Sequence, residues 1–114
     1  MIWIWKEYPM SNIQYQISNF SPLLKFKISG HSMEPTIQAG SSVLVSSFPY
    51  LLNSPKIDDI VAVKFDGKVL IKRVGEIEKN KYFITGDNPN DSYDSRRFGM
   101  IGRRDIIGKV IRII

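Results

Sequence analysis

Cysteine is absent from this 114-residue chain, and histidine occurs once. The chain can therefore form neither disulfides nor thiolate metal sites, and the sequence does not indicate whether its compartment is oxidising or reducing. A single histidine would leave carboxylates as the only other metal ligands, so we expect no metal and no cofactor. The length fits one domain with one ordinary hydrophobic core.

Long hydrophobic runs are also missing. The apolar stretch of residues 1–5 ends at Lys6 and Glu7, whereas a membrane span needs about 20 residues. The stretch is too short for the apolar core of a secretory signal as well. It has two interpretations: a first strand that packs on the domain, or a peripheral membrane contact through Trp3 and Trp5.

The net charge is +5, but the patterns of nucleic-acid binding are lacking. No basic run alternates with aromatic residues, and no helix-turn-helix or zinc-finger spacing occurs, so we expect no nucleic-acid partner. The positive charge has two interpretations: a solvated basic surface, or a surface that attracts acidic lipid head groups.

Short runs of β-branched and aromatic residues take the place of helical periodicity. Asp66-Gly67 is a strong hairpin signal, and Lys79-Asn80 indicates another turn. The pattern predicts a mainly β fold, built as a small antiparallel β-barrel or folded sheet. The expected strands are residues 23–29, 42–46, 60–65, 68–77, 82–85 and 106–114, the last interrupted at Gly108.

Two segments between these strands are predicted to be loops. Residues 48–58 carry two prolines and form an excursion from the sheet. Residues 86–104 are long and polar, and a loop of that length in a small domain is usually functional or disordered. The many side chains in this segment that can form ion pairs favour an ordered loop.

The first candidate for chemistry is the segment 29–36, Ser-Gly-His-Ser-Met-Glu-Pro-Thr. A serine hydroxyl becomes a good nucleophile only when a base takes its proton. Gly30 permits a tight turn and Pro35 fixes the chain after it. Such a turn can expose the Ser32 hydroxyl and aim the Ser32 N–H at a substrate carbonyl. The alternative is an ordinary surface turn, since the same residues favour turns.

The second candidate is Lys72, which lies in the apolar run 70–74. In a strand, Leu70, Lys72 and Val74 share one face. If that face meets the core, desolvation lowers the pKa of Lys72, and a base that works near pH 8 needs a pKa about 2 below the usual ~10.4. The alternative is a half-exposed lysine that extends its amine to water.

His31 adjoins Ser32 but is not expected to be the base. Neighbours on an extended segment point to opposite sides. No carboxylate is clearly placed in the sequence to orient its ring.

A third segment, residues 86–96, reads Gly-Asp-Asn-Pro-Asn-Asp-Ser-Tyr-Asp-Ser-Arg. Asp94 and Arg96 can form a bidentate ion pair that locks the loop, and Ser92 can hydrogen-bond near the lysine amine. The alternatives are an exposed ion pair of little energetic value and a solvent-facing serine.

In order and content these segments resemble the type I signal peptidase family of Ser-Lys endopeptidases. The shared patterns are Gly-x-Ser-Met-x-Pro-Thr, a strand with Lys-Arg-Val, Gly-Asp-Asn-x-x-x-Ser-x-Asp-Ser-Arg, and a final Gly108-Lys109-Val110. The resemblance covers roughly residues 25–112. It implies that Ser32 is the nucleophile and Lys72 the general base.

The resemblance also implies roles for neighbouring residues. Ser92 would help to orient the Lys72 amine, and the nucleophile's own N–H would form the oxyanion hole. Position 30 carries a hydroxyl in some members and is glycine here. The implied turn residues are Gly30, His31, Met33 and Pro35, and the implied supporting residues are Asp94, Arg96, Gly86, Asp87 and Asn88.

The implied fold is a mostly antiparallel β-structure in which an extended segment of a precursor protein lies alongside a strand. We expect residues 1–24 to be an N-terminal strand or lid and residues 25–114 to be one catalytic domain. The resemblance implies membrane association, but the chain has no transmembrane segment of its own. It is similar to compact maturation proteases of the nickel-type superoxide dismutase kind.

The predicted function is a serine endopeptidase that removes N-terminal signal or pro-segments after small residues. One alternative is a maturation protease dedicated to one precursor. Others are a self-cleaving repressor-type protease and a non-catalytic peptide-binding module. The only Ala-Gly bond, Ala39-Gly40, lies downstream of Ser32, which argues against self-cleavage upstream of the serine.

Overall fold

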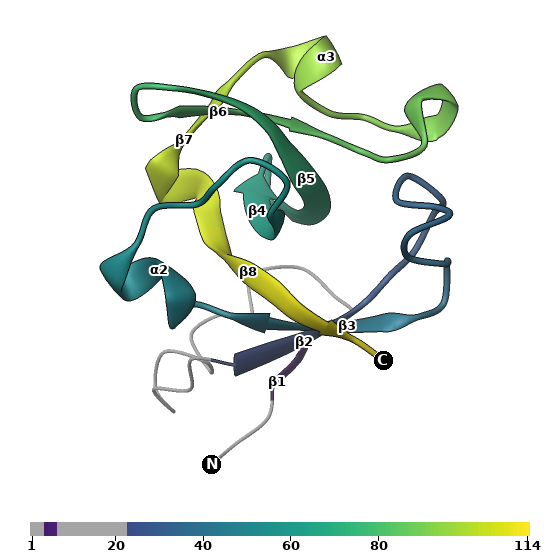
Figure 1. Cartoon of the computed structure of the whole chain (residues 1–114). Helices are drawn as coiled ribbons and strands as arrows, with labels where there is room; N and C mark the ends of the chain where they lie inside the picture. Colours follow the sequence, from purple (N-terminus) through teal and green to yellow (C-terminus); the bar gives the residue numbers. More distant parts are fainter. Residues whose placement is uncertain (1–3, 7–22) are drawn as a thin grey trace.

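A computed structural model describes residues 4–6 and 23–114 of the chain (Figure 1). Strands dominate, and the helices are single turns. The strands are β1 (Ile4–Lys6), β2 (Leu23–Lys27), β3 (Ser42–Ser46), β4 (Ile60–Phe65), β5 (Lys68–Glu78), β6 (Lys81–Thr85), β7 (Ile101–Gly102) and β8 (Ile106–Ile113). The helical turns are α2 (Pro49–Leu52), η2 (Pro89–Asp91), α3 (Ser95–Phe98) and η3 (Arg103–Asp105).

The strands form one sheet in the order β1-β2-β3-β8-β4-β5-β6-β7. Every pair is antiparallel except β1 with β2, which is parallel. The sheet is not closed, because β1 and β7 are its two edges. The prediction of a mainly β fold is therefore confirmed in its folded-sheet form and not as a barrel.

The sheet bends across β8, which runs between the lower strands β2 and β3 and the upper strands β4 to β6 (Figure 1). The bend creates two groups of buried side chains. One includes Met33 and Ile37 together with residues of β2 and β3, and the other includes Val61, Val63 and residues of β6. Ala62 of β4 joins the first group, so β4 is buried on both faces, as is typical of a central strand.

The predicted turns and most strand limits agree with the structure. Asp66 and Gly67 have φ angles of 51° and 75°, the left-handed values that a two-residue hairpin turn of type I′ needs. Lys79, at the second predicted turn, also has a positive φ of 57°. Of the predicted N-terminal segment, residues 4–6 form β1, while residues 1–3 and 7–22, including Trp3, lie outside the described residues.

The predicted interruption at Gly108 is wrong, because β8 continues through it. A Cβ atom at Gly108 would lie 2.6 Å from the carbonyl oxygen of Ser46. The glycine is therefore needed for the close approach of β3, and not to break the strand.

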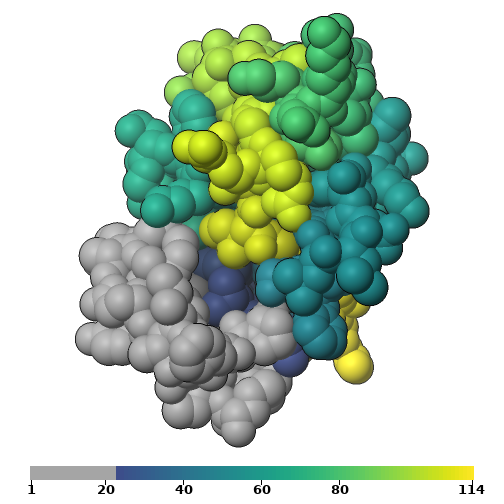
Figure 2. Space-filling view, turned by 90° about the vertical axis from the view of Figure 1, so that its left-hand side faces the viewer, coloured from purple at the N-terminus to yellow at the C-terminus, as the bar shows by residue number. Residues whose placement is uncertain are grey.

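The two predicted loops contain more structure than expected. Residues 48–58 include α2, and residues 86–104 include η2, α3 and β7. Arg103 of η3 donates to the Tyr50 carbonyl over 3.3 Å and lies over the Tyr50 ring. Figure 2 shows this face, where α2 lies beside the residues around η3. Within the described ranges, no helix is long and apolar enough to cross a membrane.

Substitution of Gly108 by alanine should lower the free energy of unfolding by about 1–3 kcal/mol, because the new methyl group must displace the β3 backbone. Gly75→Ala is the matched control: its Cβ would meet the Phe83 carbonyl oxygen at an ordinary 3.5 Å. Urea unfolding of both variants measures the difference. Equal midpoints for the two variants would contradict the close-approach explanation.

Candidate active site

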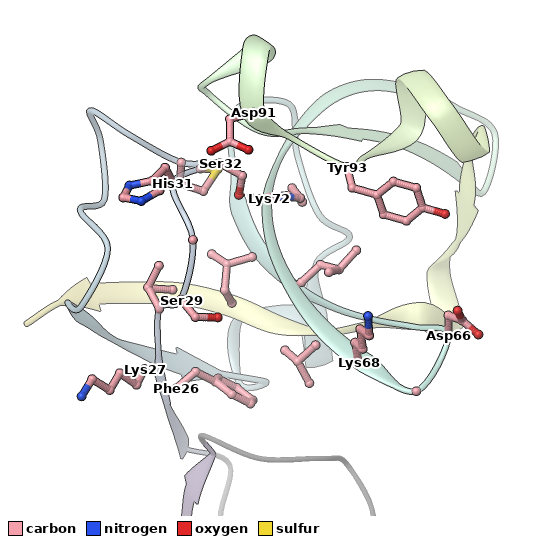
Figure 3. Close-up of a pocket in the computed structure, with 17 residues that line it drawn as sticks. Phe26, Lys27, Ser29, His31, Ser32, Asp66, Lys68, Lys72, Asp91 and Tyr93 are labelled. Atoms are coloured by element: carbon pink, nitrogen blue, oxygen red, sulfur yellow. Dashed lines mark hydrogen bonds between the residues drawn. The ribbon is translucent and has the colours of Figure 1, made fainter.

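A groove of about 680 Å³ runs along the surface between β2 and the β4–β5 hairpin. The end of β2 and residues 28–33 form one wall, and the start of β5 forms the other. Ser32, Lys72 and His31 lie at one end, and Phe26 and Lys68 lie toward the other end (Figure 3). An open groove between two strands accepts an extended peptide, which can lie alongside a strand edge.

The turn that carries Ser32 is anchored to the hydrophobic core. Met33 is 1% exposed and Ile37 is fully buried in the core, and the Ile37 N–H donates to the Met33 carbonyl over 2.9 Å. Gly30 has a φ of 82°, which a residue with a side chain rarely adopts. The predicted tight turn is therefore present, with Met33 as its apolar anchor. The Glu34–Pro35 peptide bond is cis.

The Lys72 side chain is 4% exposed and lies on β5. Its neighbour along the same face, Val74, is fully buried. The face that carries Lys72 therefore meets the core, a point that the sequence pattern left open. The Lys72 amine donates a hydrogen bond of 2.7 Å to the Ser32 hydroxyl, which joins two residues that are 40 positions apart.

Burial is the main reason that the pKa of Lys72 lies below its usual value of 10.5. The Asp94 and Asp91 carboxylates act against this shift, because each stabilises the ammonium, while the Arg96 guanidinium adds to it. Desolvation outweighs these charges. The direction of the shift agrees with the prediction from the sequence.

Residues 86–88 hold the serine turn in place through hydrogen bonds and close backbone packing. The Asn88 N–H donates to the Ser32 carbonyl over 2.8 Å, and the Asn88 side chain donates to the His31 carbonyl over 3.1 Å. A Cβ atom at Gly86 would lie 2.6 Å from the Ser32 carbonyl oxygen and would overlap Ser92. The glycine is thus required by close backbone approach, a reason that the sequence did not reveal.

Asp87 connects the same segment to β5 through a pair that sequence reasoning missed. Arg73 donates to both Asp87 carboxylate oxygens over 3.0 and 2.8 Å, and the Thr36 hydroxyl donates to Asp87 over 2.5 Å. These hydrogen bonds hold the pKa of Asp87 below its usual value. The only sequence signals for these contacts were that Arg73 belongs to the Lys-Arg-Val motif and Thr36 to the Gly-x-Ser-Met-x-Pro-Thr motif.

Asp94 is fully buried and collects hydrogen bonds from three directions. It accepts from the Gly86 N–H over 2.8 Å, from the Ser92 hydroxyl over 2.5 Å, and from the Arg96 guanidinium over 3.0 and 2.6 Å. Burial alone would raise its pKa, but these donors hold the pKa well below the usual range. The hydrogen bond that the Ser92 hydroxyl donates therefore goes to the Asp94 carboxylate and not to the Lys72 amine.

His31 has a partner that the sequence did not indicate. The Glu34 carboxylate lies 3.0 Å from the His31 Nδ1 and also accepts from the Ala39 N–H over 3.2 Å. The hydrogen bond with Glu34 raises the pKa of His31. The expectation that no carboxylate is placed to orient this ring is therefore wrong, but the Ser32 hydroxyl is hydrogen-bonded to Lys72.

Substitution of Asp94 by asparagine should lower the free energy of unfolding by about 2–3 kcal/mol, because it leaves the buried donors around it without a charged acceptor. Asp91→Asn makes the same chemical change at an exposed position of the same loop and should leave the unfolding midpoint unchanged. Thermal unfolding of both variants measures this. An unchanged midpoint for Asp94→Asn would show that the loop does not depend on this carboxylate.

Comparison with known proteins gives a family and several relatives. Residues 6–111 match the family model described as Peptidase S24-like. Signal peptidase I V of Bacillus subtilis (strain 168) is 28% identical, with 83% of this chain and 87% of that protein covered.

Two further relatives match over shorter segments. Signal peptidase I of Buchnera aphidicola subsp. Baizongia pistaciae (strain Bp) is 46% identical over 32% of this chain and 12% of its own length. Signal peptidase I of Buchnera aphidicola subsp. Schizaphis graminum (strain Sg) is 37% identical over 43% of this chain and 16% of its own length. With its family match over nearly the whole chain, this protein belongs to the S24-like peptidase family and is a member similar to signal peptidase I.

Proposed function

We propose that this peptidase is a serine endopeptidase in which Ser32 is the nucleophile and Lys72 the general base, and that it removes N-terminal signal or pro-segments after small residues. One observation carries the proposal. A lysine amine that is almost fully buried lies 2.7 Å from a serine hydroxyl at the end of an open groove. A serine needs such a base within hydrogen-bond reach to attack a carbonyl.

In the proposed mechanism the neutral Lys72 amine accepts the Ser32 proton while Ser32 Oγ attacks the scissile carbonyl. The carbonyl oxygen becomes an oxyanion, for which the Ser32 backbone N–H is the donor implied by the resemblance. The Lys72 ammonium then gives its proton to the leaving amine, and an acyl-enzyme remains. The neutral amine next takes a proton from water, and the resulting hydroxide attacks the ester. The Lys72 ammonium then returns this proton to Ser32 Oγ as the ester bond breaks and the carboxyl product leaves.

The groove supports an extended peptide as the substrate. Its walls include Ile28, Val69 and Leu70, all partly buried and apolar, and an extended chain presents alternate side chains to such walls. The preference for small residues rests on the resemblance, and the removal of signal segments is also supported by the names of the relatives, which are signal peptidases. Removal of a pro-segment from one dedicated precursor uses the same groove and the same dyad.

Self-cleavage at Ala39-Gly40 is not favoured by the geometry. The Gly40 N–H donates to the Ile28 carbonyl over 2.9 Å, and the Ala39 N–H is held by Glu34. Neither residue lines the groove. This bond would have to leave its hydrogen-bonded turn before it could reach Ser32.

Ser32→Ala and Lys72→Arg should each reduce cleavage by at least ~1,000-fold, because the first lacks the nucleophile and the second carries a guanidinium that stays protonated. The assay is a peptide library with small residues at the first and third positions before the scissile bond. Lys64→Arg, on an exposed position of β4, is the matched control and should keep wild-type turnover. Wild-type activity in Lys72→Arg, or a loss in His31→Ala as large as in Ser32→Ala, would overturn the dyad.

Activity should rise with pH, because the neutral Lys72 amine is the working form. The rise should be centred below the usual lysine pKa of 10.5, since burial lowers the pKa of Lys72. At lower pH the ammonium has no lone pair with which to accept the Ser32 proton. The measurement is kcat/KM between pH 6 and 10 on one peptide, and a flat profile would contradict Lys72 as the base.

A further inference from the structure

The backbone of residues 91–93 places two side chains in the groove beside the dyad. Ser92 is extended, with φ −142° and ψ 131°, and its hydroxyl turns inward to Asp94. Asp91 is the last residue of the helical turn η2, and Tyr93 follows Ser92. Asp91 and Tyr93 line the groove, and both are exposed.

Figure 3 shows Asp91 close to Ser32 and His31, with Tyr93 on the other side of Lys72. The Tyr93 ring is held in place by Phe98, with ring centroids 5.1 Å apart, and by Phe65 at 6.3 Å. It is still 53% exposed. The groove wall near the dyad thus combines one carboxylate with the surface of a fixed aromatic ring.

The Asp91 carboxylate has no hydrogen-bond or ion-pair partner among residues 4–6 and 23–114. It lines the groove together with His31 and Lys72, and its negative charge favours the protonated form of each. His31 is already paired with Glu34. Because Lys72 works as a neutral amine, the dyad end of the groove has an unneutralised carboxylate in a protein whose net charge is +5.

Asp66, which also lines the groove, does not offer the same feature. It belongs to the hairpin turn that begins two residues before Lys68, and Lys68 lines the same end of the groove. The two opposite charges offset each other there. Asp91 is therefore the groove carboxylate best suited to attract a cation.

We propose that Asp91 is a specificity-determining residue that selects a lysine or arginine side chain of the substrate within about two residues of the scissile bond. The carboxylate supplies the charge complement for the head of that side chain. The Tyr93 ring, which already has the Arg97 guanidinium 6.0 Å from its centroid, supplies an apolar surface for the stem. This inference rests on the proposed endopeptidase function and specifies its substrate class.

The test compares kcat/KM for a set of cleavable peptides in which one position at a time, from three residues before to three residues after the scissile bond, is lysine, glutamine or glutamate. We expect lysine to exceed glutamine by roughly three- to tenfold at one position near the bond, with glutamate the poorest. The preference should shrink as salt rises from 0.05 to 0.5 M, because part of it is screened.

Asp91→Asn should abolish this preference while it still cleaves the glutamine peptide. Glu78→Gln removes the same charge from an exposed site at the far end of β5 and should keep the preference. Because each comparison is a ratio at one pH, a change in the pKa of Lys72 does not alter it.

The outcomes separate the two proposals. Ser32-dependent cleavage with no lysine preference, or with a preference that survives in Asp91→Asn, would overturn the role of Asp91 and leave the endopeptidase in place. A preference lost equally in Glu78→Gln would assign it to net charge and also overturn the role. Absence of Ser32-dependent cleavage of every peptide would overturn both proposals.

Discussion

The contact between the Lys72 amine and the Ser32 hydroxyl constrains the rest of the structure, because it requires a lysine to be held without water. An ammonium in a low-dielectric site is expensive, so burial lowers its pKa. The fold meets this requirement by placing Lys72 in the middle of a long strand, beside the fully buried Val74. A serine turn anchored by Met33 then closes over it.

Two carboxylates, one buried and one partly buried, hold the segments of the candidate site together. Asp94 collects donors from its own loop and from Gly86, and Asp87 ties that loop to Arg73 of β5 and to Thr36 after the serine turn. Three segments that are distant in the sequence therefore meet through charge-assisted hydrogen bonds, which are stronger and more directional than neutral ones. Asp87 and Asp94 thus serve as structural hydrogen-bond acceptors.

Local patterns predicted the strands because their physical causes are local. Short runs of β-branched residues predicted β3 and β4 with their observed limits, and Asp66-Gly67 marked the hairpin through the positive φ that such a turn needs. The single turns α2 and α3 were not predicted, since four-residue helices leave almost no periodic signal. Gly108 was misread, because its reason is contact with Ser46 of another strand.

For the candidate site, the sequence by itself indicated which residues belong together, because its motifs resemble those of the type I signal peptidases in order and content. This resemblance marked Ser32, Lys72 and the segment 86–96 as parts of one unit. The sequence also determined that Lys72 shares a face with apolar neighbours, because side chains alternate along a strand. Only the tertiary structure decided that this face is buried, that Ser92 bonds to Asp94, that Glu34 reaches His31, and that Arg73 and Thr36 meet at Asp87. These contacts depend on how the sheet bends and on how loops close over it, and such long-range packing leaves no periodic trace in the chain.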